Sequence, residues 1–425
     1  MSMSFTADKQ TLEDLNLLGR FKPNSIYYLF SKIKTTGGER LLEQMFQQPL
    51  IDPDAINKRS ATFRYFQERQ LSFPISGEQI KLAENYLTMG GGSGLSFILR
   101  KKLHAFLNDD GYEKLCAGLV ATIDVLRTFR DFLQLLPDYE EAVALRKTLS
   151  DISWLDNAND FSIMTVAQYD RQLRHHHQAA MEQVLEGIYQ LDVYITVSDV
   201  ARQRGFHYAT ALPAFPAVFR TTALRHPALP AGISNPVSLD ENANVIFLTG
   251  ANMAGKSTLM KSIGVALYLA HMGFPVAAAD MEFSVRDGLY SSINVPDNLN
   301  MGYSHFYAEV LRVKQVAAEV SAGKNLLVIF DELFKGTNVK DAYDATLAVT
   351  AAFARYHNCF FVISTHIIEV GDALRQDPGI QFRYLPTILE GAIPRYTYLL
   401  REGITSDRHG MTIIENEQIL ALLKD

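Results

Sequence analysis

The sequence predicts an α + α/β protein, in which a helical part at residues 1–210 precedes an α/β part at residues 211–425. Three observations lead to this prediction. Apolar residues recur every three or four positions through the first part, which is typical of amphipathic helices. In the second part, short apolar runs bounded by Gly, Asp or His alternate with helical stretches, as in a parallel sheet with crossover helices. Five prolines between residues 213 and 236 mark the boundary.

Composition excludes several classes of protein. With 425 residues, 48% of them hydrophobic and 20% charged, the chain is neither disordered nor collagen-like. Its two cysteines, Cys116 and Cys359, fit neither a disulfide framework nor a zinc module. The chain starts without a secretory signal pattern and holds no apolar run of the length that a membrane span needs, so we expect a soluble, cytoplasmic protein with no membrane partner. The net charge of −7 gives DNA binding no support.

The first part is predicted to consist of helices joined by short breaks. Gly37-Gly38 is expected to separate one helix from the next, and a further helix is expected to open near Asp54. The glycine-rich run Gly90–Gly94 is expected to be a flexible joint. Helical stretches at 111–150 and 163–204 follow. The second would span ~60 Å if unbroken, which indicates an arm or lever.

A phosphate-binding loop is predicted where the strand Val245–Thr249 leads into a helix at Leu259–Ala270. The connecting segment has the spacing GxxxxGK[ST] of a Walker A motif. Its glycines allow backbone N–H groups to turn toward phosphate oxygens, and the helix N-terminus adds its positive end. Lys256 is expected to reach the β- and γ-phosphates of ATP, and the Ser257 hydroxyl to bind Mg²⁺. The nucleotide-binding residues are predicted to be Gly250, Ala251, Asn252, Met253, Ala254, Gly255, Lys256, Ser257 and Thr258.

Two further strands are predicted to deliver polar side chains to the same sheet edge. The apolar run at 326–330 ends in Asp331 and Glu332, a Walker B pattern. We expect Asp331 to hold Mg²⁺ and Glu332 to act as the general base toward the attacking water. The run at 360–364 is followed by His366, which is expected to donate a hydrogen bond to the γ-phosphate. Between these runs, Ser304 precedes a predicted helix, and on its own it indicates only a helix cap.

These motifs resemble those of the MutS family of DNA mismatch repair ATPases, which belongs to the ABC-like P-loop ATPases. TGANMAGKST is close to the family's TGPNMGGKST, FDELFKGTN matches its DE-x-x-x-GT pattern, and STHIIEV is similar to its ATH-x-x-EL. Upstream, LNLLGR with the segment that follows it resembles the start of the family's core domain, and LDVYITVSDVARQRGF resembles its returning lever helix.

The resemblance implies a core and lever domain at 1–210 and an ABC-type P-loop ATPase domain at 211–425. It implies that Asn252, Lys256 and Ser257 bind phosphates and Mg²⁺, and it gives Asp331, Glu332 and His366 the roles stated above. Ser304 matches a signature serine that acts in trans on ATP in a partner subunit. A homodimer through the ATPase domain, with ATP and Mg²⁺ as cofactors, is therefore expected.

Departures from the family pattern set further expectations. The core-like segment begins at about residue 10, so no mismatch-reading or connector domain is expected before it, and little room is left for a DNA-gripping clamp. Because the sequence ends at Asp425, no Smr nuclease is expected. Phe66-Gln67-Glu68 spells the family's F-x-E inside a helical stretch and is interpreted as chance. The aromatic residue that stacks on adenine aligns with Gly232, and Tyr398 is the proposed substitute.

Two clusters in the helical part have alternative interpretations. His175, His176 and His177 point in different directions on a helix, which favours a solvated face over a metal site. A stripe of four arginines could contact DNA phosphates, but acidic residues are interspersed. The stripe consists of Arg171, Arg174, Arg202 and Arg204.

Three functions follow from these observations. The first is an ATP-driven, dimeric DNA clamp in repair or recombination that binds DNA by backbone or shape rather than by mismatch. The second is a MutS-derived ATPase that acts on protein partners with little intrinsic DNA specificity, which the net acidity favours. The third, a scaffold that does not hydrolyse ATP, is disfavoured because Lys256, Asp331 and Glu332 are all present.

Overall fold

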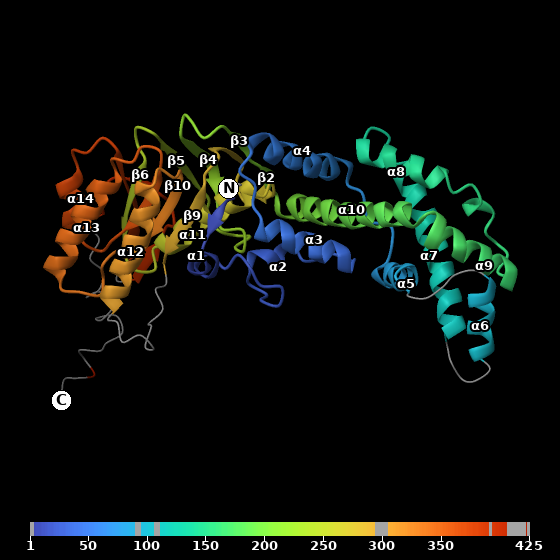
Figure 1. Cartoon of the computed structure of the whole chain (residues 1–425). Helices are drawn as coiled ribbons and strands as arrows, with labels where there is room; N and C mark the ends of the chain where they lie inside the picture. The colour runs from blue at the N-terminus through green and yellow to red at the C-terminus, as the bar shows by residue number, and fades with distance from the viewer. Residues whose placement is uncertain are drawn as a thin grey trace. The chain divides into compact units, whose positions relative to one another are not determined.

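The computed structural model describes residues 4–89, 95–105, 111–293, 305–390, 393–405 and 422 (Figure 1). It mixes helices with a mostly parallel sheet, which is consistent with the predicted α + α/β class. The chain divides into two compact units. The sheet unit is Met1–Phe30, Met45–Tyr65 and Val197–Asp425, and the helical unit is Ser31–Gln44 and Phe66–Thr196. The predicted domain boundary at 210/211 stays a prediction.

Helices make up the helical unit, and three of them also extend into residues of the sheet unit. Those three are α3 (Thr36–Gln47), α4 (Pro53–Arg69) and α10 (Gln178–Arg204). The others are α5 (Gly77–Leu87), α6 (Leu95–Ala105), α7 (Gly111–Leu133), α8 (Glu140–Ser150), the 3₁₀ turn η1 (Leu155–Asn157), α9 (Ile163–Arg171) and the π turn η2 (Gln172–His176). The glycine run at 90–94 lies outside the described residues.

The helical stretch predicted at 163–204 is present but interrupted. A π turn at Gln172–His176 separates α9 from α10. Arg174 in this turn is buried, and it donates to Asp170 Oδ1 at 3.1 Å, while the Tyr86 hydroxyl donates to the same oxygen at 3.0 Å. The stretch 111–150 is likewise interrupted between α7 and α8.

The structure also bears on the predictions for Gly37-Gly38 and for the F-x-E segment at Phe66. Gly37 and Gly38 do not end a helix but lie in the first turn of α3, where a Cβ on Gly37 would come within 2.3 Å of the Tyr189 ring. Phe66 lies inside α4 with 2% of its surface exposed and packs on Tyr139 and Tyr194. The F-x-E segment therefore lies inside a helix, as expected, with Phe66 buried and Glu68 exposed.

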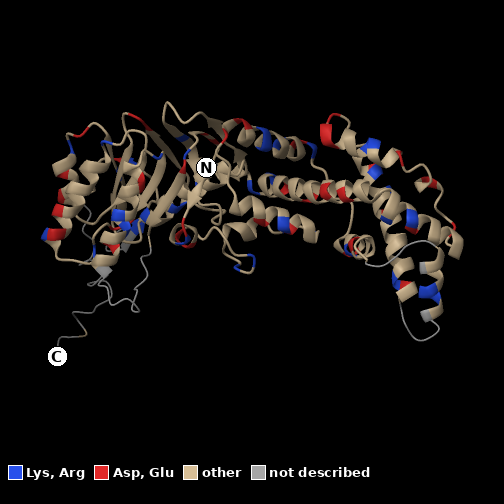
Figure 2. Cartoon of the chain, viewed as in Figure 1, with Lys and Arg blue, Asp and Glu red and all other residues tan. Residues whose placement is uncertain are grey.

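The arginine and histidine clusters of the helical part have different surroundings. His175 and His176 are exposed and His177 is half-buried. Arg174 forms an ion pair with Asp170, and Arg204 Nη1 donates to the Pro227 carbonyl oxygen at 3.2 Å. These two arginines are therefore not free to bind phosphates. Figure 2 shows that basic and acidic residues are interspersed along the described helices rather than gathered in one stripe.

The described part of the sheet unit is built around a seven-stranded sheet with the order β1-β9-β10-β11-β6-β12-β15. Neighbouring strands are parallel except β12 and β15. The strands are β1 (Thr6–Ala7), β6 (Val245–Gly250), β9 (Gly288–Ser292), β10 (Leu326–Phe330), β11 (Phe360–Ser364), β12 (Ile380–Leu385) and β15 (Arg401–Glu402). Because parallel strands end at one edge of a sheet, the residues that follow β6, β10 and β11 are brought together there.

Helices cover both faces of this sheet. On one face, Val328 and Phe330 belong to a core shared with α12 (His305–Ser321), α13 (Val339–Phe353) and α14 (Ile368–Leu374). On the other face, Gly264 of α11 (Lys256–His271) lies so close to Ile329 that an added Cβ would come within 3.0 Å of Ile329 Cδ1. Burial on both faces explains why these strands are continuous apolar runs rather than alternating ones.

Smaller elements complete the sheet unit. A second sheet has the order β3-β8-β4-β5. Its strands are β3 (Thr210–Leu212), β4 (Val218–Leu224), β5 (Asn235–Asp240) and β8 (Asp280–Ser284), and two strand pairs are β2 (His207–Tyr208) with β7 (Pro275–Val276) and β13 (Thr387–Glu390) with β14 (Ile393–Tyr396). Near the N-terminus lie α1 (Lys9–Asp14) and α2 (Ile26–Phe30). Among the described helices, none is both long enough and apolar enough to cross a bilayer.

Candidate functional site

The loop between β6 and α11, which the sequence predicts to bind phosphate, forms a tight turn. β6 is buried along its whole length and ends at Gly250, and α11 begins at Lys256. Gly255 has a φ of 101°, a left-handed conformation that residues with a Cβ rarely adopt. A side chain there would also come within 3.0 Å of the Tyr398 ring. The motif glycine at 255 is thus required both by its φ angle and by space.

Lys256 is held inside this loop. Its Nζ donates to the carbonyl oxygens of Gly250 at 2.9 Å and Ala251 at 3.2 Å, and only 6% of the residue is exposed. Burial lowers the pKa of Lys256, while the charges of Asp331 and Glu332 oppose that shift. The ammonium group therefore lies at the loop with acidic groups nearby.

Asp331 joins the ends of three strands and the start of α11. Its Oδ2 accepts a hydrogen bond from the Ser257 hydroxyl and its Oδ1 accepts one from the Ser364 hydroxyl. The Asp331 N–H donates to the Ser292 carbonyl oxygen at 3.0 Å. Ser257 and Asp331, the two residues predicted to bind Mg²⁺, are thus in direct contact. A hydroxyl and a carboxylate oxygen are hard ligands of the kind that Mg²⁺ prefers, so these residues fit the ion.

Glu332 and His366 form a hydrogen-bonded pair beside Asp331. His366 Nε2 lies 2.6 Å from Glu332 Oε1, and Lys335 Nζ lies 3.6 Å from Glu332 Oε2. The hydrogen bond from His366 and the nearby positive charges lower the pKa of Glu332 to about 2 against the opposing effect of burial. The carboxylate is therefore ionised at neutral pH.

Ser364 was missed as a site residue by the sequence analysis. It is fully buried at the end of β11, where its Oγ donates to Asp331 and accepts from the Glu332 N–H at 3.0 Å. One hydroxyl therefore fixes both acidic residues, and Glu332 has a φ of 54°, which few residues other than glycine adopt. The only signal in the sequence is its place as the last residue of a strand that precedes His366.

A cavity of about 940 Å³ opens beside the loop between β6 and α11. Its lining combines the loop and Glu332 with an apolar wall that includes Leu229 and Ile233, which are 47% and 49% exposed. Tyr398 and Gly232, the two positions considered for adenine stacking, both line this cavity. Tyr398 is anchored through its carbonyl oxygen, which accepts from Asn235 Nδ2 at 2.9 Å.

Several other predicted residues have a defined place. Asn252, Met253, Ala254 and Thr258 line the cavity together with Lys256 and Ser257. His226, not singled out from the sequence, also lines it, and burial and the charge of Lys261 lower its pKa to about 4. Ser304 lies outside the described residues, and α12 begins at the next residue. Its predicted role in trans stays a prediction.

Part of the chain is similar to known proteins. Residues 246–421 match the family model of MutS domain V. The DNA mismatch repair proteins MutS of Listeria welshimeri serovar 6b and Listeria monocytogenes serovar 1/2a are each 28% identical over 183 residues, which is 43% of this chain and 21% of each relative. That of Listeria innocua serovar 6a is 27% identical over the same length. The chain thus spans about a fifth, 21%, of the length of the curated relatives it matches. These similarities support a MutS-family protein.

Proposed function

We propose that this chain is a MutS-family ATPase that binds ATP with Mg²⁺ and hydrolyses it to ADP and phosphate. The observation that supports this most is the arrangement at one sheet edge, where Asp331 contacts Ser257 and Ser364 and where Glu332 contacts His366. This arrangement combines ligands for a metal ion with an ionised carboxylate beside a phosphate-binding loop. The MutS domain V match over residues 246–421 supports the same proposal.

In this proposal, the backbone N–H groups of residues 250–258 surround the phosphates and Lys256 contacts the β- and γ-phosphates. Ser257 and Asp331 would hold Mg²⁺, which would supply positive charge to the phosphate oxygens. Glu332 orients the attacking water and accepts its proton. His366 directs Glu332 through their hydrogen bond and contacts the γ-phosphate. Ser364 holds the Asp331 carboxylate and the backbone N–H of Glu332.

The base of the nucleotide is proposed to occupy the apolar side of the cavity. Tyr398 offers a half-exposed ring for stacking, and Leu229 and Ile233 offer apolar contact beside it. Gly232, which aligns with the family's stacking aromatic, contributes no ring.

Hydrolysis by the wild-type chain tests the proposed activity. ATP turnover is expected to require Mg²⁺ and to stop when EDTA removes it, because Ser257 and Asp331 cannot neutralise the phosphate charge by themselves. The turnover is expected to be slow without a stimulating partner. The measurement is phosphate release at saturating ATP with and without Mg²⁺. Hydrolysis that continues unchanged in EDTA would contradict the proposed site.

We further propose that the ATPase part forms a homodimer in which Ser304 of one chain completes the site of the other. Mixing Lys256→Ala chains with Ser304→Ala chains then produces heterodimers with one intact site. With random pairing, half of the dimers are mixed and each has one working site of two, so activity returns to about a quarter of the wild-type value. Each variant alone is the control. Mixtures that stay as inactive as the single variants would contradict a shared site.

DNA is proposed as the partner, bound through backbone or shape, in repair or recombination in the cytoplasm. We expect the 425-residue chain to prefer a G·T mismatch over matched duplex by less than about 10-fold. The reason is that a mismatch wedge needs an exposed aromatic ring, whereas Phe66 of the F-x-E segment is 2% exposed. Competition binding of matched, mismatched and four-way DNA at several salt concentrations measures this, and a steep salt dependence is expected.

The alternative proposal is an ATPase that acts on protein partners. The net charge of −7 and the burial of Arg174 favour it. The same competition experiment separates the two, since an absence of binding to all three DNAs at low salt, with and without ATP, would support the alternative. A strong preference for the mismatch would contradict both.

A further inference from the structure

The N-terminal residues pack against the ATP-binding part of the sheet unit. β1 pairs in parallel with β9, with Thr6 opposite Gly288, at the edge of the seven-stranded sheet. A Cβ on Gly288 would lie 2.5 Å from the Thr6 carbonyl oxygen, so this close pairing requires glycine. Phe5 packs on the rings of Tyr268 and His271 in α11, the helix that begins at Lys256. Residues 5–7 are therefore built into the sheet unit.

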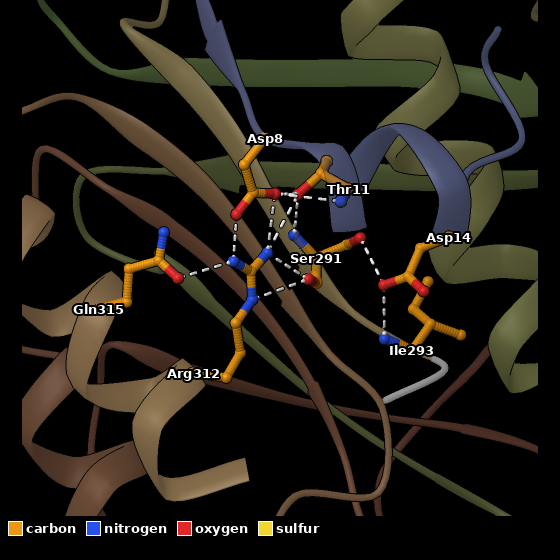
Figure 3. A network of polar contacts seen from close by, with 7 residues as sticks. All are labelled: Asp8, Thr11, Asp14, Ser291, Ile293, Arg312 and Gln315. Atoms are coloured by element: carbon orange, nitrogen blue, oxygen red, sulfur yellow. Dashed lines mark hydrogen bonds and ion pairs between the residues drawn. The ribbon is translucent and has the colours of Figure 1, made fainter. Parts of the chain in front are cut away.

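α1, which follows, holds the end of β9 through a network of polar contacts (Figure 3). The Ser291 N–H donates to Thr11 Oγ1 at 2.9 Å, and the Ser291 hydroxyl donates to Asp14 Oδ2 at 2.8 Å. The Ser291 carbonyl oxygen accepts from Arg312 Nη2 at 2.6 Å. The Ile293 N–H donates to Asp14 Oδ2 at 2.9 Å. Every polar group of Ser291 is thus engaged by α1 or by Arg312.

Arg312 of α12 completes the network. Its guanidinium forms an ion pair with Asp8, the N-cap of α1, and its Nη2 lies 3.2 Å from Thr11 Oγ1. The guanidinium also lies over the Tyr290 ring at 5.5 Å from the centroid. Arg312 is 6% exposed and Thr11 is fully buried. Buried charged and polar groups of this kind are costly to leave unpaired, which makes the network sensitive to the loss of one member.

Two contacts link this network to the acidic residues of the candidate site. The Asp331 N–H donates to the carbonyl oxygen of Ser292, the residue after Ser291. In addition, the first turn of α12 packs on the loop that follows Glu332. There the Phe306 ring lies 6.1 Å from the Phe334 ring, and Gly336 approaches the Phe306 backbone so closely that an added Cβ would lie 2.8 Å from its nitrogen. The residues of the network and the acidic residues of the candidate site all belong to the sheet unit.

We propose that Phe5–Asp14 and Arg312 position Asp331 for Mg²⁺ binding. This inference rests on the proposed ATPase function and adds to it a role for the first residues of the chain. Thr11 and Arg312 are positioning residues, since neither touches the nucleotide cavity. Residues that hold a metal ligand in place commonly affect metal affinity, and their loss costs about 10-fold or more.

The test compares Thr11→Val with Thr11→Ser. Valine keeps the shape but leaves the Ser291 N–H and Arg312 without their shared acceptor, whereas serine keeps that oxygen. For Thr11→Val we expect the Mg²⁺ concentration at half-maximal ATP hydrolysis to rise about 10-fold, with ATP affinity in EDTA unchanged within about twofold. Thr11→Ser is expected to restore the wild-type Mg²⁺ profile. Asp8→Asn, which weakens the pair with Arg312, is expected to shift the profile in the same direction.

A second readout does not depend on hydrolysis. In the protein without nucleotide, hydrogen exchange measured by mass spectrometry is expected to speed up in the peptides that cover residues 288–293 and 331–338 for Thr11→Val but not for Thr11→Ser. Arg220→Gln, which breaks an exposed ion pair with Glu282 in the same unit, is the control and is expected to leave both peptides and the Mg²⁺ profile unchanged.

The outcomes separate the two proposals. If the wild type hydrolyses no ATP, the proposed function fails, and the exchange of residues 331–338 alone decides whether α1 holds Asp331 in place. If the wild type is active and Thr11→Val keeps both the Mg²⁺ profile and the exchange rates, the positioning role is overturned. Should Thr11→Val fail to fold, Asp8→Asn decides by the same two measurements.

Discussion

Replacing Glu332 with glutamine is expected to lower ATP turnover at least ~100-fold while ATP still binds. Glutamine has nearly the same shape and keeps an oxygen for the contact with His366, but it cannot accept a proton from water. The pKa of Glu332, held at about 2 by His366 and the neighbouring positive charges, means that the wild-type group is ionised near neutral pH. Single-turnover hydrolysis together with fluorescent ATP binding measures the two effects separately.

The matched control for this variant is Glu282→Gln. Glu282 is an exposed carboxylate of the same unit, paired with Arg220 rather than with a site residue. Its removal is expected to leave both turnover and ATP binding at the wild-type level. A wild-type rate for Glu332→Gln would remove the residue from the mechanism, and a loss of ATP binding would mean that it acts in binding rather than in proton transfer.

The parts of the site that could be predicted are those set by local sequence. In the proposed site, Gly255, Lys256 and Ser257 have fixed spacing because one short loop would place several N–H groups around one phosphate. Asp331 and His366 follow apolar runs, and parallel strands carry such residues to one edge. The spacing within the loop and the shared edge of parallel strands therefore predict where these side chains lie, without knowledge of any long-range contact.

Other parts depend on contacts between residues far apart in the chain. Ser364 holds Asp331 and Glu332, which lie more than 30 positions away in the sequence, and a serine at a strand end has no local signature. β1 is two residues long, too short for any periodicity, although its pairing with β9 places residue 6 beside residue 288. The π turn at Gln172–His176 was missed because helical periodicity continues through it while Arg174 turns inward to Asp170.

Lys256→Ala is expected to weaken ATP binding itself by about 100-fold. Lys256 Nζ now donates to the carbonyl oxygens of Gly250 and Ala251, and phosphate oxygens offer the same ammonium a charged acceptor. Two charge-assisted hydrogen bonds at ~1.5 kcal/mol each amount to ~3 kcal/mol, or about two powers of ten in Kd. Equilibrium binding of a fluorescent ATP analogue to the purified chain measures the change.

The comparison with Lys340→Ala makes this result specific. Lys340 is an exposed lysine of α13, so its removal changes the net charge equally without touching the loop. If both variants weaken binding alike, the effect is general electrostatics, and the local role of Lys256 is refuted. If only Lys256→Ala loses affinity while Glu332→Gln keeps it, the loop supplies binding and the carboxylate supplies chemistry. That division is the one expected when the lysine contacts the phosphates and the glutamate acts on water.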